Sequence, residues 1–168
     1  NPNNYKTPLS VSARVPNQNI KGEFADGAAF IIISPKEFMA AANRLKDKRQ
    51  QQGSNYLKTI VVDIDQIYNE FSNGMMDPVA MRNFVKFAYS NWQERPVYIL
   101  FLGDGSYDYK NNYNLYNGNL KNWIPPIEKN SQYSDDVESF CSDDYILEIT
   151  ENNNEPSSTN IVDFASGR

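Results

Sequence analysis

Histidine is absent from this sequence of 168 residues, and cysteine occurs once, as Cys141. Without histidine the chain lacks the commonest general base and the usual partner of a cysteine or serine nucleophile. A self-contained catalytic triad is therefore excluded, and a structural zinc site of the usual Cys and His kind is disfavoured. A single cysteine also rules out an internal disulfide framework and leaves the redox compartment open.

Long hydrophobic runs are missing as well, because no stretch approaches the roughly 18 apolar residues of a membrane-spanning helix. We therefore expect no membrane span in this chain. Hydrophobic residues still make up 40% of the sequence, and 11 Tyr, 9 Phe and 2 Trp are enough for one domain core. The chain starts without Met and stops directly after an apolar run, so we expect both ends to be boundaries inside a longer protein.

The net charge of -5 is unevenly distributed. Residues 128–168 carry ten Asp or Glu against Lys129 and Arg168, a local balance of -8, so the remainder is mildly basic. An acidic segment of this kind repels nucleic acid and anionic lipid, while it supplies the oxygen ligands that calcium prefers. We therefore expect no nucleic-acid partner.

Short apolar runs of the type found in strands buried on both faces punctuate the chain. They are Ala28–Ile33, Leu57–Ile64 and Val97–Leu102. Segments with helical spacing separate them, which predicts an α/β fold with a mostly parallel sheet and helices on both faces. Two further apolar segments, 145–150 and 160–165, bring the predicted sheet to about four or five strands.

The helices between these strands have recognisable start signals. Ser34-Pro35 and Asp77-Pro78 each place a capping residue before a proline at the first helical position, and Asp65 is a candidate cap for a shorter helix. The second long helix carries one apolar stripe, made of Met81, Phe84, Val85, Ala88 and Trp92. That stripe predicts which helix face is buried.

Aspartates cluster after the third predicted strand, where parallel sheets gather ligands. Because calcium takes six to eight oxygen ligands, we predict a candidate calcium site. Its ligands would come from Asp104, Asp108, Asp135, Asp136, Asp143 and Asp144. Three alternatives stay open: a tight turn at Gly103–Asp108 with Asp104 bonded to the backbone, solvated acids that cap turns, and a carboxylate pair for acid–base chemistry.

Two other features of this half of the chain point to structural roles. Cys141 has no cation nearby in sequence and several carboxylates that disfavour its thiolate, so we expect an unreactive cysteine. The segment around residues 107–123 is rich in aromatic side chains, which more often hold a long loop onto a sheet than bind a ligand. These side chains are Tyr107, Tyr109, Tyr113, Tyr116 and Trp123.

Several motifs, taken together and in this order, resemble the leading part of gingipain-type cysteine peptidase domains. They are Ile67–Gly74, Asp77-Pro78 with the helix to Trp92, Tyr98–Asp108, Ile124-Pro125, Ser142–Tyr145 and Val162–Arg168. The resemblance covers the chain from about residue 28 to its end and is greatest to the sortases of the type IX secretion system.

The resemblance implies a caspase-like α/β architecture in two side-by-side subdomains. Residues 28–168 would be the first subdomain and residues 1–27 a connecting arm from a preceding domain. In this family the catalytic His and Cys lie in the second subdomain, so no residue here is assigned a catalytic role and this chain alone would be inactive. It would be the scaffold of a secreted or surface cysteine endopeptidase or sortase, outside the cytoplasm at the outer membrane or cell surface of a bacterium.

The same resemblance implies the partners: the catalytic subdomain of the same polypeptide, and the protein substrates of the parent enzyme. No cofactor is required, and calcium remains a candidate ligand because peptidases of this type are calcium-stabilised. Two other readings stay open. The first is a non-catalytic adaptor of the same fold within a secretion machine, and the second is an unrelated α/β module that binds calcium or a small anion at the ends of its strands.

Overall fold

The fold was determined as a computed structural model. It describes residues 14–51, 53, 56–106, 108, 112–113, 123–130, 139–149 and 164–168. Within these residues no helix combines the length and the apolar character needed to cross a bilayer.

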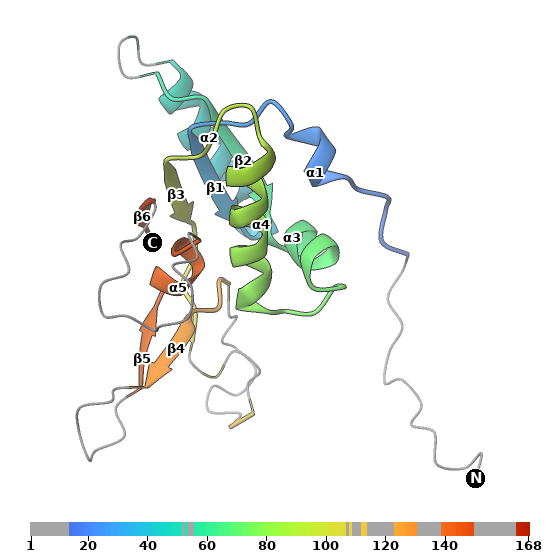
Figure 1. The fold of residues 1–168 in the computed structure, drawn as a ribbon, viewed down its shortest axis with the longest axis vertical. Coiled ribbons are helices and arrows are strands. Elements are labelled where there is room, and N and C mark those ends of the chain that lie inside the picture. Colours follow the sequence, from blue (N-terminus) through green and yellow to red (C-terminus); the bar gives the residue numbers. More distant parts are fainter. Residues whose placement is uncertain are drawn as a thin grey trace.

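A four-stranded parallel sheet forms the centre of the molecule, with strand order β2-β1-β3-β6 (Figure 1). Its strands are β1 (Phe30–Ser34), β2 (Thr59–Asp63), β3 (Tyr98–Phe101) and β6 (Ala165–Gly167). All five residues of β1 are buried, because this strand has a neighbour on each side and packing on both faces. The parallel α/β class predicted from the apolar runs is therefore confirmed.

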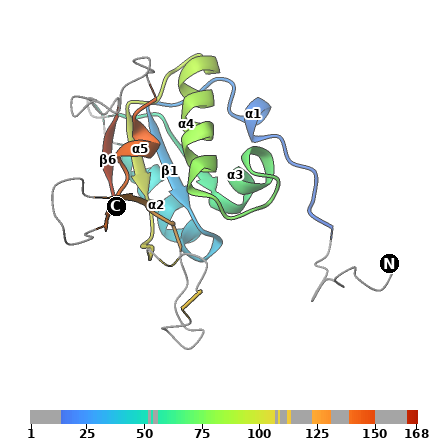
Figure 2. The same ribbon diagram turned by 60° about the horizontal axis from the view of Figure 1, so that its bottom comes forward.

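Helices cover the two faces unequally. On one face lies α2 (Met39–Gln50), preceded by the 3-10 turn η2 (Lys36–Phe38), and it packs through Ala42 and Leu45 on Phe30 and Ile32. On the other face lie α3 (Ile64–Phe71) and α4 (Pro78–Asn91), over Ile31, Ile33, Ile99 and Phe101 (Figure 2). Alternate residues of β1 thus point to different cores.

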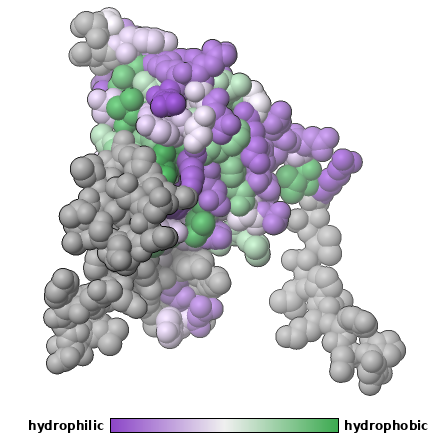
Figure 3. Space-filling view, in the orientation of Figure 1, coloured by the Kyte–Doolittle hydropathy of each residue, from purple (hydrophilic) through white to green (hydrophobic). Residues whose placement is uncertain are grey.

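The predicted stripe of α4 is the centre of the larger core. Met81, Phe84, Val85, Ala88 and Trp92 are all at least 96% buried. The Phe84 ring lies 5.7 Å from that of Phe71 and 5.8 Å from that of Trp92, both in edge-to-face geometry. Figure 3 shows a mostly hydrophilic outer surface over the helices, with hydrophobic side chains visible between them.

One of the predicted helix starts is confirmed and two are corrected. The Asp77 side chain accepts a hydrogen bond from Val79 N at 2.9 Å, and Pro78 opens α4 as predicted. Ser34 instead ends β1, fully buried, and its hydroxyl donates to the Pro35 carbonyl, so it does not cap the next helix. The cap of α3 is Asp63, not Asp65, because the helix begins immediately where β2 ends.

The second half of the chain adds elements that periodicity did not identify. Strands β4 (Ile127–Asn130) and β5 (Ser139–Ser142) form an antiparallel pair beyond the carboxyl ends of β1 and β3 (Figure 1). The predicted strand 145–150 is wrong: α5 (Asp144–Leu147) occupies its start, and the adjacent Ile146 and Leu147 are both buried, as on a helix turn. β6 begins at Ala165, the last residue of the predicted strand 160–165, and Phe164 lies just before it, while residues 160–163 lie outside the described part.

Residues 14–27 pack onto α3 through a short helix, α1 (Ile20–Glu23). Ile20 is fully buried, and its backbone N–H donates to the Glu70 carboxylate at 2.7 Å. The Gln18 amide donates to the Gln66 carbonyl at 2.8 Å and accepts from Asn69. These bonds attach the segment before the sheet firmly to the domain; residues 1–13 of the predicted connecting arm lie outside the described part.

Candidate functional site

The loop after β3 starts at the carboxyl edge of the sheet, where ligands bind in parallel α/β folds. Gly103 has φ of +149°, and a Cβ atom there would lie 2.9 Å from Trp123 Cβ, so a side chain is excluded by both strain and space. The Ile124 N–H donates to the Asp104 carbonyl at 3.0 Å. Glycine at 103 therefore lets the segment 123–126 lie directly against the end of β3.

The two acidic residues of this loop serve its own backbone. The Asp104 carboxylate accepts a hydrogen bond from the Gly105 N–H at 2.8 Å. Asp108 is 91% buried, and its two carboxylate oxygens accept from the backbone N–H groups of Asn112 and Tyr113 at 2.8 and 2.9 Å. Asp108 is thus a turn cap in the described geometry, but a buried one rather than the solvated acid of the alternative reading.

Arg168, directly after β6, makes the most extensive polar contacts at this edge. Its Nε and Nη2 atoms donate to the two oxygens of Asp143 at 3.0 and 2.5 Å, and Nη1 donates to the Ile124 carbonyl at 2.9 Å. Its guanidinium also lies 5.9 Å from the Phe101 ring. Because a bidentate guanidinium–carboxylate pair fixes both orientation and distance, Arg168 joins β6, the end of β5 and the 123–126 segment.

A small cavity of about 200 Å³ lies beside this ion pair. It is lined by Asp104, Gly105, Pro126, Cys141, Ser142, Asp143 and Arg168. No cation lies near Cys141 in the sequence. The fold nevertheless brings Arg168, 27 residues further along the chain, to the same cavity. The charge of Arg168 is already matched by Asp143, so the cavity wall is not a purely cationic environment for the thiol.

The six predicted calcium ligands are placed as follows. Asp104, Asp108 and Asp143 make the contacts described above, Asp144 is exposed in the first turn of α5, and Asp135 and Asp136 lie outside the described residues. Across the described ranges, no three Asp, Glu, Cys or His side chains come together in a way that could hold a metal ion. Calcium binding at this edge therefore stays a prediction.

Of the predicted aromatic anchors, Trp123 takes the expected role. Its ring lies 4.8 Å from that of Phe38, and the residue is half-buried against the sheet. Tyr113 is 70% exposed and does not hold the loop down, because the turn around it is fixed by Asp108. Tyr107, Tyr109 and Tyr116 lie outside the described residues.

A second charged group at the carboxyl edge was not identified from the sequence. Asp63 ends β2 almost fully buried, and its carboxylate accepts from the Asp65 N–H at 2.9 Å and lies 3.8 Å from Lys36 Nζ. Burial raises the pKa of Asp63 above its usual value. The hydrogen bond from the Asp65 N–H and the charge of Lys36 act in the opposite direction, but their effect is smaller. Its hydrogen bond begins α3, so its first role is that of a helix cap.

Together the sheet and its carboxyl edge define a caspase-like α/β unit in which an arginine–aspartate pair closes the edge. Proton transfer by a histidine is impossible within the chain, because the sequence contains none. The chain belongs to peptidase family C25, whose family model matches residues 25–168. This match confirms the resemblance to gingipain-type peptidases.

A solved structure agrees with the family. The crystal structure of dimeric latent PorU from Porphyromonas gingivalis matches with a TM-score of 0.68 and 30% sequence identity. The match covers 92% of this chain and 15% of that chain, so the present chain spans a small part of the matched protein. A comparison with curated protein sequences found no match.

Proposed function

We propose that this chain is the first, non-catalytic subdomain of a gingipain-type cysteine peptidase, and that it supports a catalytic subdomain elsewhere in the same polypeptide. One observation carries the proposal: a member of a cysteine peptidase family has no histidine to activate a thiol. The matched PorU chain is much longer than the matched segment, which agrees with further domains in the parent protein.

The geometry supports a scaffold role for the carboxyl edge of the sheet. Arg168, Asp143 and the Ile124 carbonyl join three separate segments, and Asp108 fixes the loop that follows β3. Groups held by several hydrogen bonds position neighbouring loops with little freedom, which is the contribution that a supporting subdomain makes to a peptidase site. By family resemblance, the parent enzyme acts outside the cytoplasm on protein substrates, at the surface of a bacterium.

The test uses the full-length parent protein and its Cys141→Ser variant. We expect peptide cleavage that is abolished by a thiol-alkylating agent, with the alkylated catalytic cysteine located by mass spectrometry outside residues 1–168. The Cys141→Ser variant should cleave within about twofold of the parent rate, because Cys141 has no histidine partner in this chain.

Two results would contradict the proposal in different ways. Loss of cleavage in the Cys141→Ser variant, with the fold preserved by circular dichroism, would make Cys141 the nucleophile. No cleavage by a folded full-length protein on a broad peptide library would instead favour the adaptor reading. The matched control is Ser142→Ala, which changes the neighbouring residue of the same cavity and leaves the thiol in place.

A further inference from the structure

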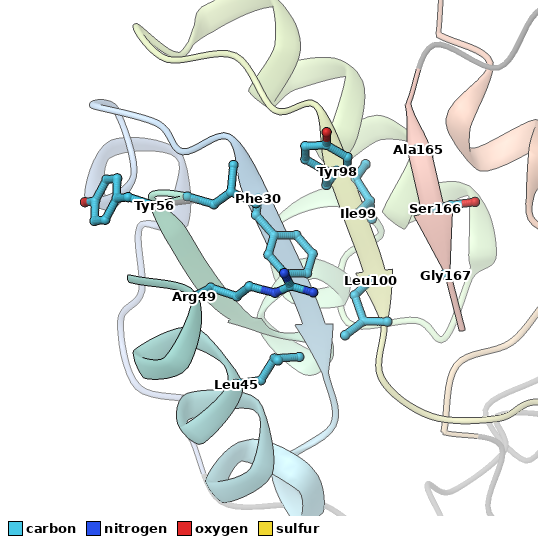
Figure 4. A pocket seen from close by; sticks show the side chains of 11 residues that line it. Phe30, Leu45, Arg49, Tyr56, Tyr98, Ile99, Leu100, Ala165, Ser166 and Gly167 are labelled. Carbon is cyan, nitrogen blue, oxygen red and sulfur yellow. The ribbon is translucent and has the colours of Figure 1, made fainter. Parts of the chain in front are cut away.

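The described residues leave the face of the sheet that carries α2 partly uncovered. A groove of about 610 Å³ runs along α2 over β1, β3 and β6 (Figure 4). Phe30, Leu100 and Ala165 lie on its floor, and Leu45 and Arg49 of α2 form one wall. Tyr98 on the same strand face is 43% exposed. Parallel sheets are normally covered on both faces, so this open stretch beside α2 marks a place where the described residues supply no covering element.

The topology explains why the described helices leave this part of the face open. The β1 to β2 connection runs toward one edge of the sheet and places α2 on this face, whereas the return to β3 places α3 and α4 on the other face. The step from β3 to β6 continues in that second direction, and α5 packs beside α4, with the Tyr145 ring 4.6 Å from the Arg82 guanidinium. Right-handed crossovers that extend the sheet in this direction keep adding helices opposite to the groove.

The shape of the groove fits a helix laid beside α2. Packed helices lie 8–10 Å apart, and small residues allow the closest approach to a sheet. On the groove face β6 offers Ala165 and Gly167, paired in register with Tyr98 and Leu100 of β3. The volume is enough for on the order of two helical turns.

The positive charge beside the groove favours an acidic side chain on the segment that fills it. The Arg49 guanidinium lies 6.0 Å from the Phe30 ring and points over the floor of the groove (Figure 4). The α2 helix carries Arg44, Lys46, Lys48 and Arg49 against one acidic residue, Asp47. A carboxylate on the occupant would therefore be attracted here, and desolvation by the apolar floor would strengthen its pairing with Arg49.

We propose that this groove receives an amphipathic helix from another domain of the same polypeptide, with apolar residues on the floor and an Asp or Glu paired with Arg49. This inference rests on the proposed function, which places further domains in the parent chain. About two helical turns bury far less than the roughly 1,200 Å² of a stable complex between separate proteins, so attachment through the same chain supplies the effective concentration. The matched PorU chain has ample length outside the matched unit.

The first arm of the test is a cross-link in the full-length protein. Arg49→Lys keeps the charge and adds a reactive amine, and a zero-length carbodiimide reagent then joins it to a carboxylate in contact. We expect a link from position 49 to an Asp or Glu outside residues 25–168, in a segment with helical apolar spacing. Arg44→Lys, on the same helix and exposed, is the matched control and should give no such link.

The second arm measures access to the floor. In the full-length protein we expect alkylation of the Tyr98→Cys variant to be at least tenfold slower than that of Met75→Cys, whose side chain is 63% exposed in the loop between α3 and α4. Equal rates overturn the proposal, and so does the absence of the expected cross-link. A link that joins differently isotope-labelled copies also overturns it and identifies a second copy as the occupant. Neither arm measures cleavage, so an inactive parent protein would not affect the result.

Discussion

The ion pair between Arg168 and Asp143 allows the closest quantitative test of how the carboxyl edge is held. The two side chains are 24% and 21% exposed, and Arg168 also donates to the Ile124 carbonyl. Hydrogen bonds to charged groups contribute about 1.5–3 kcal/mol, and exposed ion pairs about 0–1 kcal/mol. For this partly buried bidentate pair we expect Asp143→Ala to lower the free energy of unfolding by about 2 kcal/mol and Arg168→Ala by about 2–3 kcal/mol.

A double-mutant cycle separates the pair from its surroundings. Because both single substitutions remove the same interaction, the double variant should be little less stable than Arg168→Ala alone, which gives a coupling energy of about 1–2 kcal/mol. The assay is urea denaturation followed by tryptophan fluorescence, with unchanged m-values required for comparison. The coupling should survive in 1 M NaCl better than that of an exposed pair.

The control cycle uses the pair Lys36 and Asp65, which are 69% and 57% exposed at a distance of 3.2 Å. We expect a coupling of about 0.5 kcal/mol or less for this pair. Additive effects of Asp143→Ala and Arg168→Ala would refute the reasoning, because they would show that the bidentate geometry contributes no joint stabilisation.

Three further predictions concern the same edge. Gly103→Ala should lower the free energy of unfolding by about 2–3 kcal/mol, because φ of +149° and the approach of Trp123 Cβ to 2.9 Å exclude a side chain; an unchanged urea midpoint would contradict this. Asp63 has a raised pKa, so the folded state binds its proton more tightly than the unfolded state and its contribution to stability falls as pH rises from 3.8 through the folded pKa. The Asp63→Asn variant keeps an oxygen that can cap the helix but has no titrating carboxyl group, so its stability should not show this decline with pH. The free energy of unfolding of the variant, measured from pH 3 to 7, should therefore rise relative to that of the parent protein. A difference that stays constant over this range would contradict the raised pKa of Asp63. If calcium binds the acidic segment, 100 times its Kd stabilises the protein by about 2.7 kcal/mol, and equal melting temperatures in calcium and in chelator would remove calcium from the site.

The parallel core could be predicted from local patterns because its strands are buried on both faces. Such strands read as continuous apolar runs, and β2 and β3 lie within the predicted segments, while β1 extends one residue past its segment, to Ser34. The start of α4 at Asp77-Pro78 was also readable, since a cap and a proline at the first position act within four residues. The start of α2 was misread because Ser34 is drawn into the sheet, where the tertiary burial of β1 decides its role.

The second half of the chain was less predictable for a physical reason. The segment 144–149 has apolar residues at 146, 147 and 149, a pattern too short to distinguish a strand from a helix turn. Its packing on α4 favours the helix turn α5. The pair of β4 and β5 depends on bonds between separated segments and has no strong signal in either strand alone.

For the candidate site, the sequence by itself determined the absence of histidine and the membership of a peptidase family, and it predicted the loop after β3 as the place of the acidic candidates. Only the tertiary structure decided which of the aspartates are already used: Asp108 by backbone N–H groups, and Asp143 by Arg168. The same holds for the groove over β3 and β6, which no local pattern contains. These features depend on contacts between residues far apart in the chain. The order of the strands and the direction of the crossovers determine such contacts, and both are properties of the complete fold rather than of any local segment.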